Sequence, residues 1–519
     1  MFLSNAETIF RGRFTRYLIG GLALVLLGAL AYLPSLQGEF VYDDVSFIVE
    51  NTAKHDLSQW PSYFLSSRAV SSEDHQIYRP LRTLSYALEW RAFGAHPWGY
   101  HCTQVVLHLL NVLLAWWLGI RVFGDFAWMD QKRAMEAAWF GAAVFLLHPV
   151  QVESVYWISS RGDLLYAFFA LWALLAYRLY LVEGKRWAHF FSTAATLLAL
   201  LSKETAVVLP FLLLTYAFCL GDRIRIRRLG RLIRTIKPHL ILVGVFFLVR
   251  LFVVGSVAQR GYWAGGFWPT LWTVPSIVYG YFELLLFPHP LYVIRQVSAV
   301  STASSGAFWQ PLILMGTLAG ALLWVGLGRR WIIMALALAF WTLLPVSNLV
   351  PFRGIMAEHF LYLAVLGFGW ILGAVFVRLW NRSWNEDRAH KKERLVPSLL
   401  AFTMLLSYGL FTLERGEDWQ NEWTLWSHEV EAAPASFQAH IGLGLAAAHR
   451  QDFLLAEDQF RKAISLRGDS GLAHYGLSLT LMHQNPQRLE ESMVHALLAQ
   501  QFNYPQAGQL LRHLSLLGV

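Results

Sequence analysis

The amino-acid sequence predicts an all-α, polytopic membrane protein with about eleven spans and a small helical domain at its C-terminal end. Apolar residues make up 56% of the 519 residues, and charged residues make up 15%, against roughly 25% in soluble proteins. Long apolar runs also recur along the chain. A helix needs about 20 apolar residues to cross a bilayer. The bilayer core holds no water to pair with backbone N–H and C=O groups, so a spanning segment must pair them itself, as a helix does, and these runs therefore predict transmembrane helices.

The predicted spans begin close to the N terminus. Arg11, Arg13 and Arg16 precede the first run, and no small-residue cleavage site follows it, so we expect an uncleaved helix with its N terminus in the cytoplasm. The eleven predicted spans are 17–36, 100–122, 134–149, 160–182, 187–203, 204–220, 238–256, 309–327, 331–350, 357–377 and 395–413.

Two basic loops indicate the orientation of the later spans. The loops 222–237 and 378–394 are rich in Lys and Arg, so both are expected on the cytoplasmic side. A further apolar run at 270–287 lies between them and contains Pro275 and Glu283. If this run crossed the bilayer, the two basic loops would lie on opposite sides. We therefore predict that it is re-entrant or interfacial, which places the C terminus outside the cytoplasm.

The C-terminal part differs in composition from the rest. Residues 415–519 hold 7 Lys and Arg against 11 Asp and Glu, and their apolar residues are spaced as in amphipathic helices. Three pairs of like residues are 34 positions apart, which is the tetratricopeptide period; they are His440 and His474, Leu443 and Leu477, and His449 and His483. We predict a transmembrane domain at 1–414 and a tetratricopeptide-like domain at 415–519, with segments 422–433 and 505–517 as caps. A plain helical bundle is the alternative.

The predicted topology brings four short segments to the outer side of the membrane. They are 37–99, 148–154, 201–205 and 348–359. Nearly all conspicuous charges other than the cytoplasmic anchors fall in or beside these segments. Their convergence predicts a functional site at the outer face.

Asp43 and Asp44 are the first candidates for chemistry. Two adjacent carboxylates resist each other's ionisation, and flanking aromatic rings exclude water, so the pKa of one carboxyl would rise toward the range of a general base. The alternative is a solvated pair of acids at the entry of a loop.

A polar stripe lies along the predicted span 100–122. His101, Gln104, His108 and Asn111 follow the i, i+3, i+7, i+10 spacing of one helix face. Polar groups inside a membrane face a bundle interior or a wet cavity. We expect His108 and Asn111 to form a hydrogen-bonded packing seam and His101, at the outer end, to face the cavity.

The stretch 148–163 adds four more candidates, which are His148, Glu153, Arg161 and Asp163. Arg161 and Asp163 are close enough in sequence to form an ion pair with each other, which is the structural alternative to a role in binding.

Cations near the outer face fit a phosphate. Lys203 adjoins Glu204, which predicts a local ion pair or an anion site, with a snorkelling lysine as the alternative. Arg79 and Arg353 provide planar guanidinium groups, which bind phosphate in bidentate fashion.

Several other functions have little support. The chain shows no zinc-ligand spacing, no Gly-rich phosphate loop, no Walker motif and no serine triad. Its two cysteines, Cys102 and Cys219, both lie in predicted spans and do not indicate a disulfide framework. The net charge of +8 lies in the membrane part, where it sets orientation, so nucleic acid is not indicated. Carboxylates, cations and aromatic rings at a membrane surface suit a lipid-linked phosphate donor and a hydroxyl acceptor.

Six short motifs resemble one family in the same order along roughly 17–490. They are FVYDD, YRPL, PWGYH, LLHPVQVESVYWISSRGDLL, LLSKET and PVSN…AEHFLYL. With the repeats that follow, they resemble the transmembrane-and-tetratricopeptide O-mannosyltransferases and their prokaryotic relatives. The resemblance implies a GT-C-type bundle, a polyprenyl-phosphate sugar donor and an acidic pair in the first outer loop. By position, Asp43 and Asp44 match that pair, with Asp43 as the base.

The chain departs from the family pattern in two places. His359 occupies a position where animal members usually have Arg, and Arg353 is the candidate substitute for the phosphate contact there. The repeat array is also shorter than in animal members, so the acceptor need not be theirs. Its short loops suit a bacterial inner membrane, with an undecaprenyl-phosphate sugar and catalysis on the periplasmic side.

The resulting prediction is an inverting O-glycosyltransferase that acts on protein Ser or Thr and has a carboxylate base. The alternatives are the same chemistry on a glycolipid or polysaccharide acceptor, and a non-enzymatic envelope scaffold. A divalent metal requirement is left open. The predicted donor-phosphate residues are Arg79, Lys203, Arg353 and His359, and the predicted substrate-binding residues are Tyr78, His101, His148, Glu153, Arg161, Asp163, Glu204 and Glu358.

Overall fold

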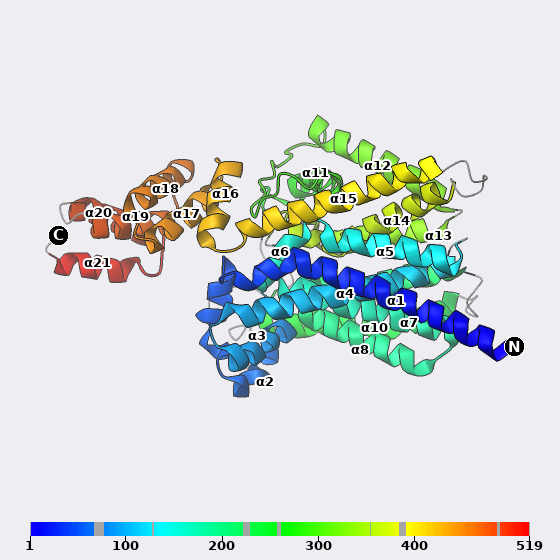
Figure 1. The fold of residues 1–519 in the computed structure, drawn as a ribbon. Helices are drawn as coiled ribbons and strands as arrows, with labels where there is room; N and C mark the ends of the chain where they lie inside the picture. Colours follow the sequence, from blue (N-terminus) through cyan, green and yellow to red (C-terminus); the bar gives the residue numbers. More distant parts are fainter. Residues whose placement is uncertain are drawn as a thin grey trace. The chain divides into compact units, whose positions relative to one another are not determined.

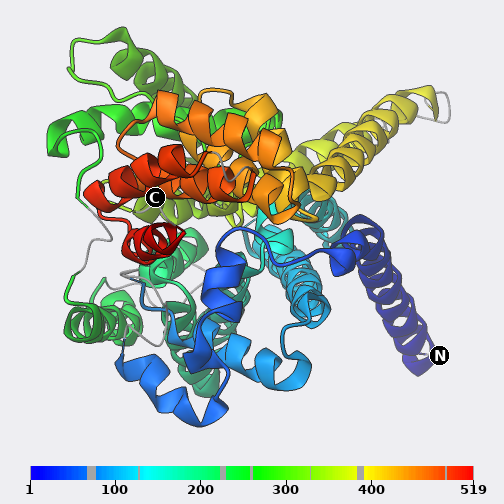
Figure 2. The same ribbon diagram turned by 90° about the vertical axis from the view of Figure 1, so that its left-hand side faces the viewer.

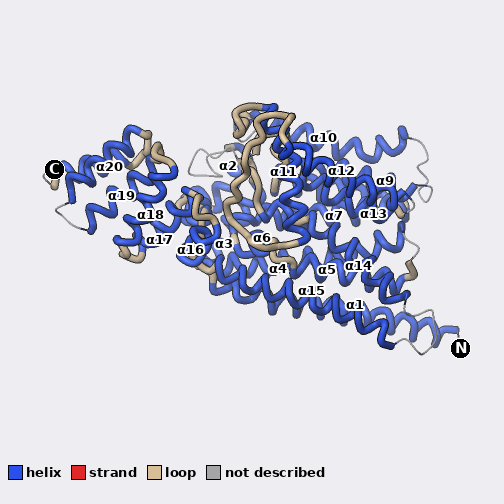
Figure 3. Tube along the Cα trace, turned by 90° about the horizontal axis from the view of Figure 1, so that it is seen from above, coloured by secondary structure: helices blue, strands red, loops and turns tan. Residues whose placement is uncertain are grey.

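The computed structural model describes residues 2–66, 77–126, 129–221, 229–256, 261–327, 329–352, 354–382, 391–484 and 488–517. These residues form helices and loops, and none of them lies in a strand (Figure 3). The chain divides into two compact units. The first comprises Met1–Gly38, Asp43–Leu291 and Val297–Gly416, and the second comprises Glu39–Tyr42, Tyr292–Gln296 and Glu417–Val519.

The long helices of the first unit run side by side (Figure 1). The α-helices of this unit are α1 (Phe2–Tyr32), α2 (Trp60–Leu65), α3 (Pro80–Phe93), α4 (Pro97–Phe126), α5 (Gln131–Leu147), α6 (Gln151–Tyr156), α7 (Arg161–Glu183), α8 (Arg186–Ser202), α9 (Leu209–Leu220), α10 (Leu229–Val254), α11 (Phe267–Leu286), α12 (Gly306–Leu327), α13 (Arg330–Leu343), α14 (Ala364–Arg382) and α15 (Lys391–Asp418). Each of the eleven predicted spans coincides with one of these helices. Helix α1, dark blue in Figure 2, leads from the N terminus into the unit.

Within the described residues, six segments are long and apolar enough to cross a membrane. They are Phe14–Gln37, Pro97–Phe126, Ile158–Glu183, Leu232–Val254, Gly306–Val325 and Leu395–Asp418. Three shorter apolar helices occur at Glu204–Leu220, Arg330–Val346 and Ala364–Trp380. The all-α membrane fold class is therefore confirmed, whereas eleven crossings remain a prediction.

Three predicted connections differ from the structure. The run 270–287 forms α11, a continuous 20-residue helix with Pro275 inside it, so it is not broken in the middle as many re-entrant segments are. The predicted loop 222–237 is shorter than expected because α10 already begins at Leu229. The loop 378–394 is shortened on both sides, by α14 up to Arg382 and by α15 from Lys391.

Small residues let α5 and α14 approach closely. A Cβ added at Gly369 would lie 2.4 Å from the carbonyl oxygen of Gly141, and one added at Gly373 would lie 2.1 Å from that of Ala137. Glycine is therefore required at both positions. Close backbone approach through small residues is a common way to pack helices in membranes, where lipid supplies little hydrophobic driving force.

The second unit consists mainly of helical hairpins. Its helices are α16 (Glu422–Ala432), α17 (Phe437–His449), α18 (Phe453–Leu466), α19 (Gly471–Gln484), α20 (Leu489–Gln501) and α21 (Ala507–Leu516). Ala447, Ala456, Phe460, Leu477 and Leu481 form a core cluster between the two hairpins. The predicted caps correspond to α16 and α21.

The hairpins repeat a hydrogen bond at the 34-residue offset. His440 Nε2 lies 3.0 Å from the carbonyl oxygen of Pro434, and His474 Nε2 lies 3.1 Å from that of Gly468. The same side chain therefore binds the backbone just before helices α17 and α19. This equivalence supports the predicted period, while the tetratricopeptide assignment itself stays a prediction.

Candidate active site

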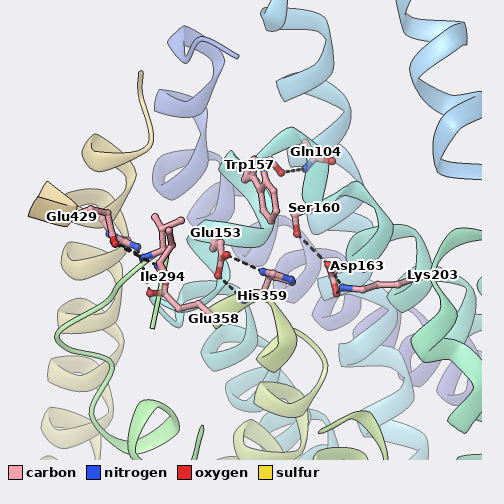
Figure 4. A network of polar contacts seen from close by, with 12 residues as sticks. Gln104, Glu153, Trp157, Ser160, Asp163, Lys203, Ile294, Glu358, His359 and Glu429 are labelled. Carbon is pink, nitrogen blue, oxygen red and sulfur yellow. Dashed lines mark hydrogen bonds and ion pairs between the residues drawn. The ribbon is translucent and has the colours of Figure 1, made fainter. Parts of the chain in front are cut away.

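Side-chain contacts join the predicted outer segments of the first unit. Arg79 of the 37–99 segment binds Glu204 of the 201–205 segment, and Glu153 of the 148–154 segment binds His359 of the 348–359 segment. Lys203 binds Asp163, at the start of α7. Segments far apart in sequence therefore meet at one site, part of which Figure 4 shows.

The two adjacent carboxylates differ in their surroundings. Asp44 is fully buried, and its Oδ1 accepts the backbone N–H of Ser159 at 2.7 Å. Asp43 is only partly buried. A π-helical turn, Val45–Val49, follows the pair directly. Such turns are rare and often occur at functional sites. Asp44 is therefore held to the backbone, whereas Asp43 keeps access to solvent.

Two buried cations lie beside the carboxylate pair. Lys54 donates to the carbonyl oxygen of Phe47, within the π-helical turn, and its Nζ lies 5.4 Å from the centroid of the Phe47 ring. Arg82 lies over the same ring at 4.8 Å, and its Nη1 donates to the carbonyl oxygen of Ser159 at 3.1 Å. Burial, and next Arg82, lower the pKa of Lys54 well below its ordinary value.

The remaining edge of the Arg82 guanidinium has no hydrogen-bond partner. Arg82 is 2% exposed, and its Nε and Nη2 atoms are both buried without a partner among the described residues. Burial lowers the pKa of Arg82, and Asp43 is among the groups that oppose this shift. Since buried polar groups normally find a partner, this edge is available to a planar or tetrahedral anion.

The ion pairs differ from those expected from sequence proximity. Arg161 does not pair with Asp163. Its Nη1 binds Glu89 at 2.5 Å, and its Nε binds Gln104 at 2.6 Å. At the start of α7, the side chain of Arg161 thus reaches Glu89, whereas that of Asp163 reaches Lys203. These contacts contradict the structural alternative of a local Arg161–Asp163 pair.

Lys203 and Glu204 likewise do not pair with each other. Lys203 Nζ binds both carboxylate oxygens of Asp163, at 2.5 and 2.6 Å, while Glu204 accepts a bidentate pair of hydrogen bonds from Arg79 at 2.9 and 2.7 Å. Lys203 ends α8 in extended backbone, so consecutive side chains point apart. Lys203 is 1% exposed, which contradicts the alternative of a snorkelling lysine.

A pocket lies next to this cluster. Its lining comprises Asp163, Tyr166, Lys203, Thr205, Thr342, Val346, His359, Phe360, Tyr362 and Leu363. Two predicted phosphate-binding residues, Lys203 and His359, therefore face the same space. His359 Nδ1–H donates to the Glu153 carboxylate oxygen Oε1 over 2.8 Å, and the backbone N–H of His359 donates to Oε2 at 2.8 Å.

The turn between the two clusters contains a glycine. A Cβ added at Gly162 would lie 3.7 Å from Cδ of both Arg79 and Arg82 and 3.2 Å from the carbonyl oxygen of Ser202. Both arginines therefore pass close to Gly162, and the carboxylate pair and the pocket border the same stretch of chain, Ser159–Asp163.

Other predicted site residues have structural contacts. Tyr78 is 2% exposed and donates to the carbonyl oxygen of Phe64 at 3.0 Å. His148 is fully buried, and its Nε2 lies 3.1 Å from the carbonyl oxygen of Leu285. Glu358 is buried and pairs with Arg415 at 3.4 Å. Arg353 lies outside the described residues.

The inner end of the polar stripe on α4 packs as predicted. His108 Nδ1 lies 2.8 Å from the hydroxyl of Tyr362, and Asn111 donates to the same hydroxyl at 3.1 Å, so the packing seam is confirmed. His101 is fully buried against Gly38 rather than exposed at a cavity. Gln104 donates to the carbonyl oxygen of Trp157 at 3.0 Å (Figure 4).

Sequence reasoning did not identify several charged residues of the site, namely Lys54, Arg82, Glu89, Arg250 and Arg415. Arg82, Tyr86 and Glu89 follow an i, i+4, i+7 spacing on α3, which is the signal that identified the α4 stripe. Lys54 ends a three-residue 3₁₀ helix, Thr52–Lys54, which is too short for any periodicity to indicate its burial. Among the described residues, no three His, Cys, Asp or Glu side chains are grouped so that they could hold a metal ion.

Comparisons with known proteins confirm the predicted resemblance. No protein-family model matches the chain. It is 25% identical to protein O-mannosyl-transferase F38B6.6 of Caenorhabditis elegans over 82% of its own length, and 25% identical to human protein O-mannosyl-transferase TMTC4 over 83%. A 190-residue stretch is 34% identical to mouse protein O-mannosyl-transferase TMTC1. The matches cover 59% and 63% of the first two relatives, so the chain spans about six tenths of their length.

Solved structures give a weaker similarity. ArnT from Cupriavidus metallidurans, in the apo state, is 16% identical with a TM-score of 0.46, covering 82% of this chain and 81% of ArnT. The structure of ArnT bound to undecaprenyl phosphate gives a TM-score of 0.45 at 15% identity.

Proposed function

We propose that the chain, which is similar to protein O-mannosyl-transferases over more than four fifths of its length, is a glycosyltransferase. In this proposal it transfers a sugar from a polyprenyl-phosphate donor to a Ser or Thr hydroxyl of a protein. The site faces the periplasm of a bacterial inner membrane. The names of the relatives favour mannose as the sugar and protein as the acceptor, over a glycolipid or polysaccharide.

The observation that carries the proposal is the buried edge of Arg82 that has no hydrogen-bond partner among the described residues, with Asp43 as a nearby negative charge. A partly exposed carboxylate lies within electrostatic reach of a buried guanidinium whose Nε and Nη2 atoms have no hydrogen-bond partner in the described part of the chain. A carboxylate can remove a proton, and the open arginine edge matches the geometry of a phosphate. Lys203 and His359 line the adjoining pocket, where they would meet other parts of the donor head group.

The reaction follows from these roles. Asp43 accepts the proton of the acceptor hydroxyl while the hydroxyl oxygen bonds to the anomeric carbon of the sugar. The bond from that carbon to the phosphate oxygen breaks, and the polyprenyl phosphate leaves with the bonding electron pair. Arg82 donates two N–H groups to the phosphate as its charge develops. Attack opposite the leaving group inverts the anomeric carbon.

Asp43→Asn tests the assigned base. Asparagine keeps the size of the side chain but does not take the proton, and general-base catalysis contributes about 10²- to 10⁴-fold. Turnover of polyprenyl-phosphate mannose with a Ser/Thr peptide should fall by that order in the purified protein. Glu50→Gln, an exposed change in the same loop, is the control. Near wild-type turnover in Asp43→Asn would contradict the assignment.

A further inference from the structure

The segment directly before the carboxylate pair belongs to the second unit. Glu39–Tyr42 is grouped with α16–α21, although Asp43, the next residue along the chain, belongs to the first unit. Two hydrogen bonds, each donated by a backbone N–H of this segment, bind it to residues at or just before the start of α16. Glu39 N–H donates to the carbonyl oxygen of Gln420 at 2.8 Å, and Tyr42 N–H donates to Oε1 of Glu422 at 2.5 Å.

Glu422 is held in place within its own helix. Its second carboxylate oxygen accepts the indole N–H of Trp426, one turn further along α16. The Trp426 ring in turn makes an edge contact with the Tyr42 ring at a centroid distance of 5.5 Å. Asn421 and Thr424 form a capping box at this helix start. The carboxylate that binds the Tyr42 backbone is therefore fixed in direction.

Tyr42 has a strained backbone. Its φ is +57°, in the left-handed region that glycine adopts readily and bulky residues rarely adopt. Such a conformation persists only where surrounding contacts hold it, and strained residues concentrate at functional sites. Glu422 and Trp426 of α16 both contact Tyr42, which directly precedes Asp43 in the chain.

We infer that Glu422 is a positioning residue, which fixes the backbone of the segment that leads directly into Asp43. This inference rests on the proposed function of Asp43. It assigns to the second unit a role in turnover that is separate from any role of its repeats in binding an acceptor. A similar carboxylate on the same helix, Glu429, binds the backbone N–H of Val293 and of Ile294 (Figure 4).

The test uses the full-length protein in lipid nanodiscs. Glu422→Ala removes both carboxylate hydrogen bonds, so Tyr42 should relax and Asp43 should lose its direction. We expect kcat to fall by about tenfold or more, as loss of a hydrogen bond to a charged group allows, while the KM for the polyprenyl-phosphate donor stays within about twofold. Glu431→Ala, an exposed change on the same helix, should leave both constants unchanged.

Two further measurements separate positioning from a general loss of stability. Tyr42→Gly placed in the Glu422→Ala protein should restore part of kcat, because glycine adopts positive φ without strain. If Glu422 only stabilised the fold, this loosening change would lower kcat further. Deuterium uptake of the peptide covering 38–47 should also rise in Glu422→Ala and not in Glu431→Ala.

The uptake measurement does not depend on activity. If the wild type transferred no sugar from any polyprenyl-phosphate donor, the proposed function would fail, and uptake at 38–47 would still decide whether Glu422 holds this segment. Unchanged uptake together with unchanged kcat in Glu422→Ala would overturn the inference. Lower kcat in the double variant than in Glu422→Ala would overturn it as well.

Discussion

At the scale of single residues, neighbouring side chains of the same type differ in their burial and in their hydrogen-bond partners. Asp44 is buried and accepts the Ser159 N–H, while Asp43 stays partly exposed. Arg79, just before α3, binds Glu204 with two of its N–H groups, while Nε and Nη2 of Arg82, on α3, have no hydrogen-bond partner among the described residues. Because a bidentate guanidinium satisfied by one carboxylate has little left for a second anion, we assign the donor phosphate to Arg82 rather than Arg79.

Arg82→Lys should weaken donor binding. Lysine keeps the charge but has no planar fork, so two directed hydrogen bonds to phosphate become one point charge. We expect the KM for the polyprenyl-phosphate donor to rise about tenfold, the loss of one charged hydrogen bond, with a smaller change in kcat. Steady-state kinetics with varied donor measure this. Arg91→Lys, an exposed change on the same helix, is the control, and an equal KM in both variants would argue against the assignment.

At the scale of secondary-structure elements, two helices with similar glycine patterns differ in how closely they pack against their neighbours. Helices α12 and α14 both contain spaced glycines, yet among the glycines whose surroundings are described only those of α14 lie against another helix. A Cβ at Gly373 would lie 2.1 Å from the carbonyl oxygen of Ala137, whereas one at Gly316 of α12 would have no heavy atom within 4 Å. The pattern of small residues alone does not distinguish the two cases.

Gly373→Ala and Gly316→Ala form a matched pair for stability. The first change forces the backbones of α5 and α14 apart, and overpacking typically costs about 1–3 kcal/mol. The second places a methyl group in open space on a helix. The thermal unfolding midpoint of the purified protein in detergent should therefore fall in Gly373→Ala and stay unchanged in Gly316→Ala. Equal midpoints would mean that α5 and α14 leave room for a methyl group at Gly373, which would contradict the prediction.

The α19–α20 hairpin contains a pair of stacked histidines. His474 Nδ1 lies 2.9 Å from His495 Nδ1, and His474 Nε2 must donate to the carbonyl oxygen of Gly468. His495 Nδ1–H is therefore the donor between the two neutral rings, and protonation of both rings would bring two positive charges together. Burial, His474 and Arg461 lower the pKa of His495, and Glu491 opposes them.

This pair predicts that the hairpin loses stability in mild acid. Because the folded-state pKa of His495 is lowered, the unfolded chain binds the extra proton first, and stability rises with pH between the folded pKa and the ordinary value of about 6.5. Protection of the 471–501 peptides against hydrogen exchange, corrected for intrinsic rates, should therefore fall from pH 7.5 to 5.5. His495→Gln should flatten this dependence, and an unchanged slope in that variant would contradict the prediction.

At the scale of the whole molecule, the orientation of the chain depends on how many helices cross the membrane. The basic loops around 222–237 and 378–394 are predicted on one side, which requires that α11 does not cross. On this reading the C-terminal unit lies outside the cytoplasm, on the side where Asp43 and Arg82 would meet the donor and the acceptor.

A fusion experiment tests this orientation. Alkaline phosphatase fused after Val519 should be active, and green fluorescent protein at the same position should be dark, because each reporter works on only one side of a bacterial inner membrane. A second pair of fusions within 222–228 should give the opposite result and serves as the internal control. An inactive phosphatase with a fluorescent protein at the C terminus would mean that α11 crosses.

The sequence by itself determined the class of protein and the location of its helices. Apolar runs near 20 residues leave few alternatives to helices in a bilayer, so all eleven predicted spans coincide with helices, and the 34-residue offset identified both hairpins. Short motifs such as FVYDD and AEHFLYL were enough to indicate the family resemblance, which the comparisons confirm.

Only the tertiary structure decided which charges pair. Sequence proximity suggested that Arg161 pairs with Asp163 and Lys203 with Glu204. In the structure Arg161 pairs with Glu89, Asp163 with Lys203, and Glu204 with Arg79, and the partners lie between 40 and 125 positions apart. A buried charge is stabilised by whichever opposite charge the packing of helices brings within hydrogen-bond reach, and that depends on which helices are neighbours. For the same reason Arg82, with its open edge, and Glu422, which holds the segment before Asp43, were not evident from the sequence.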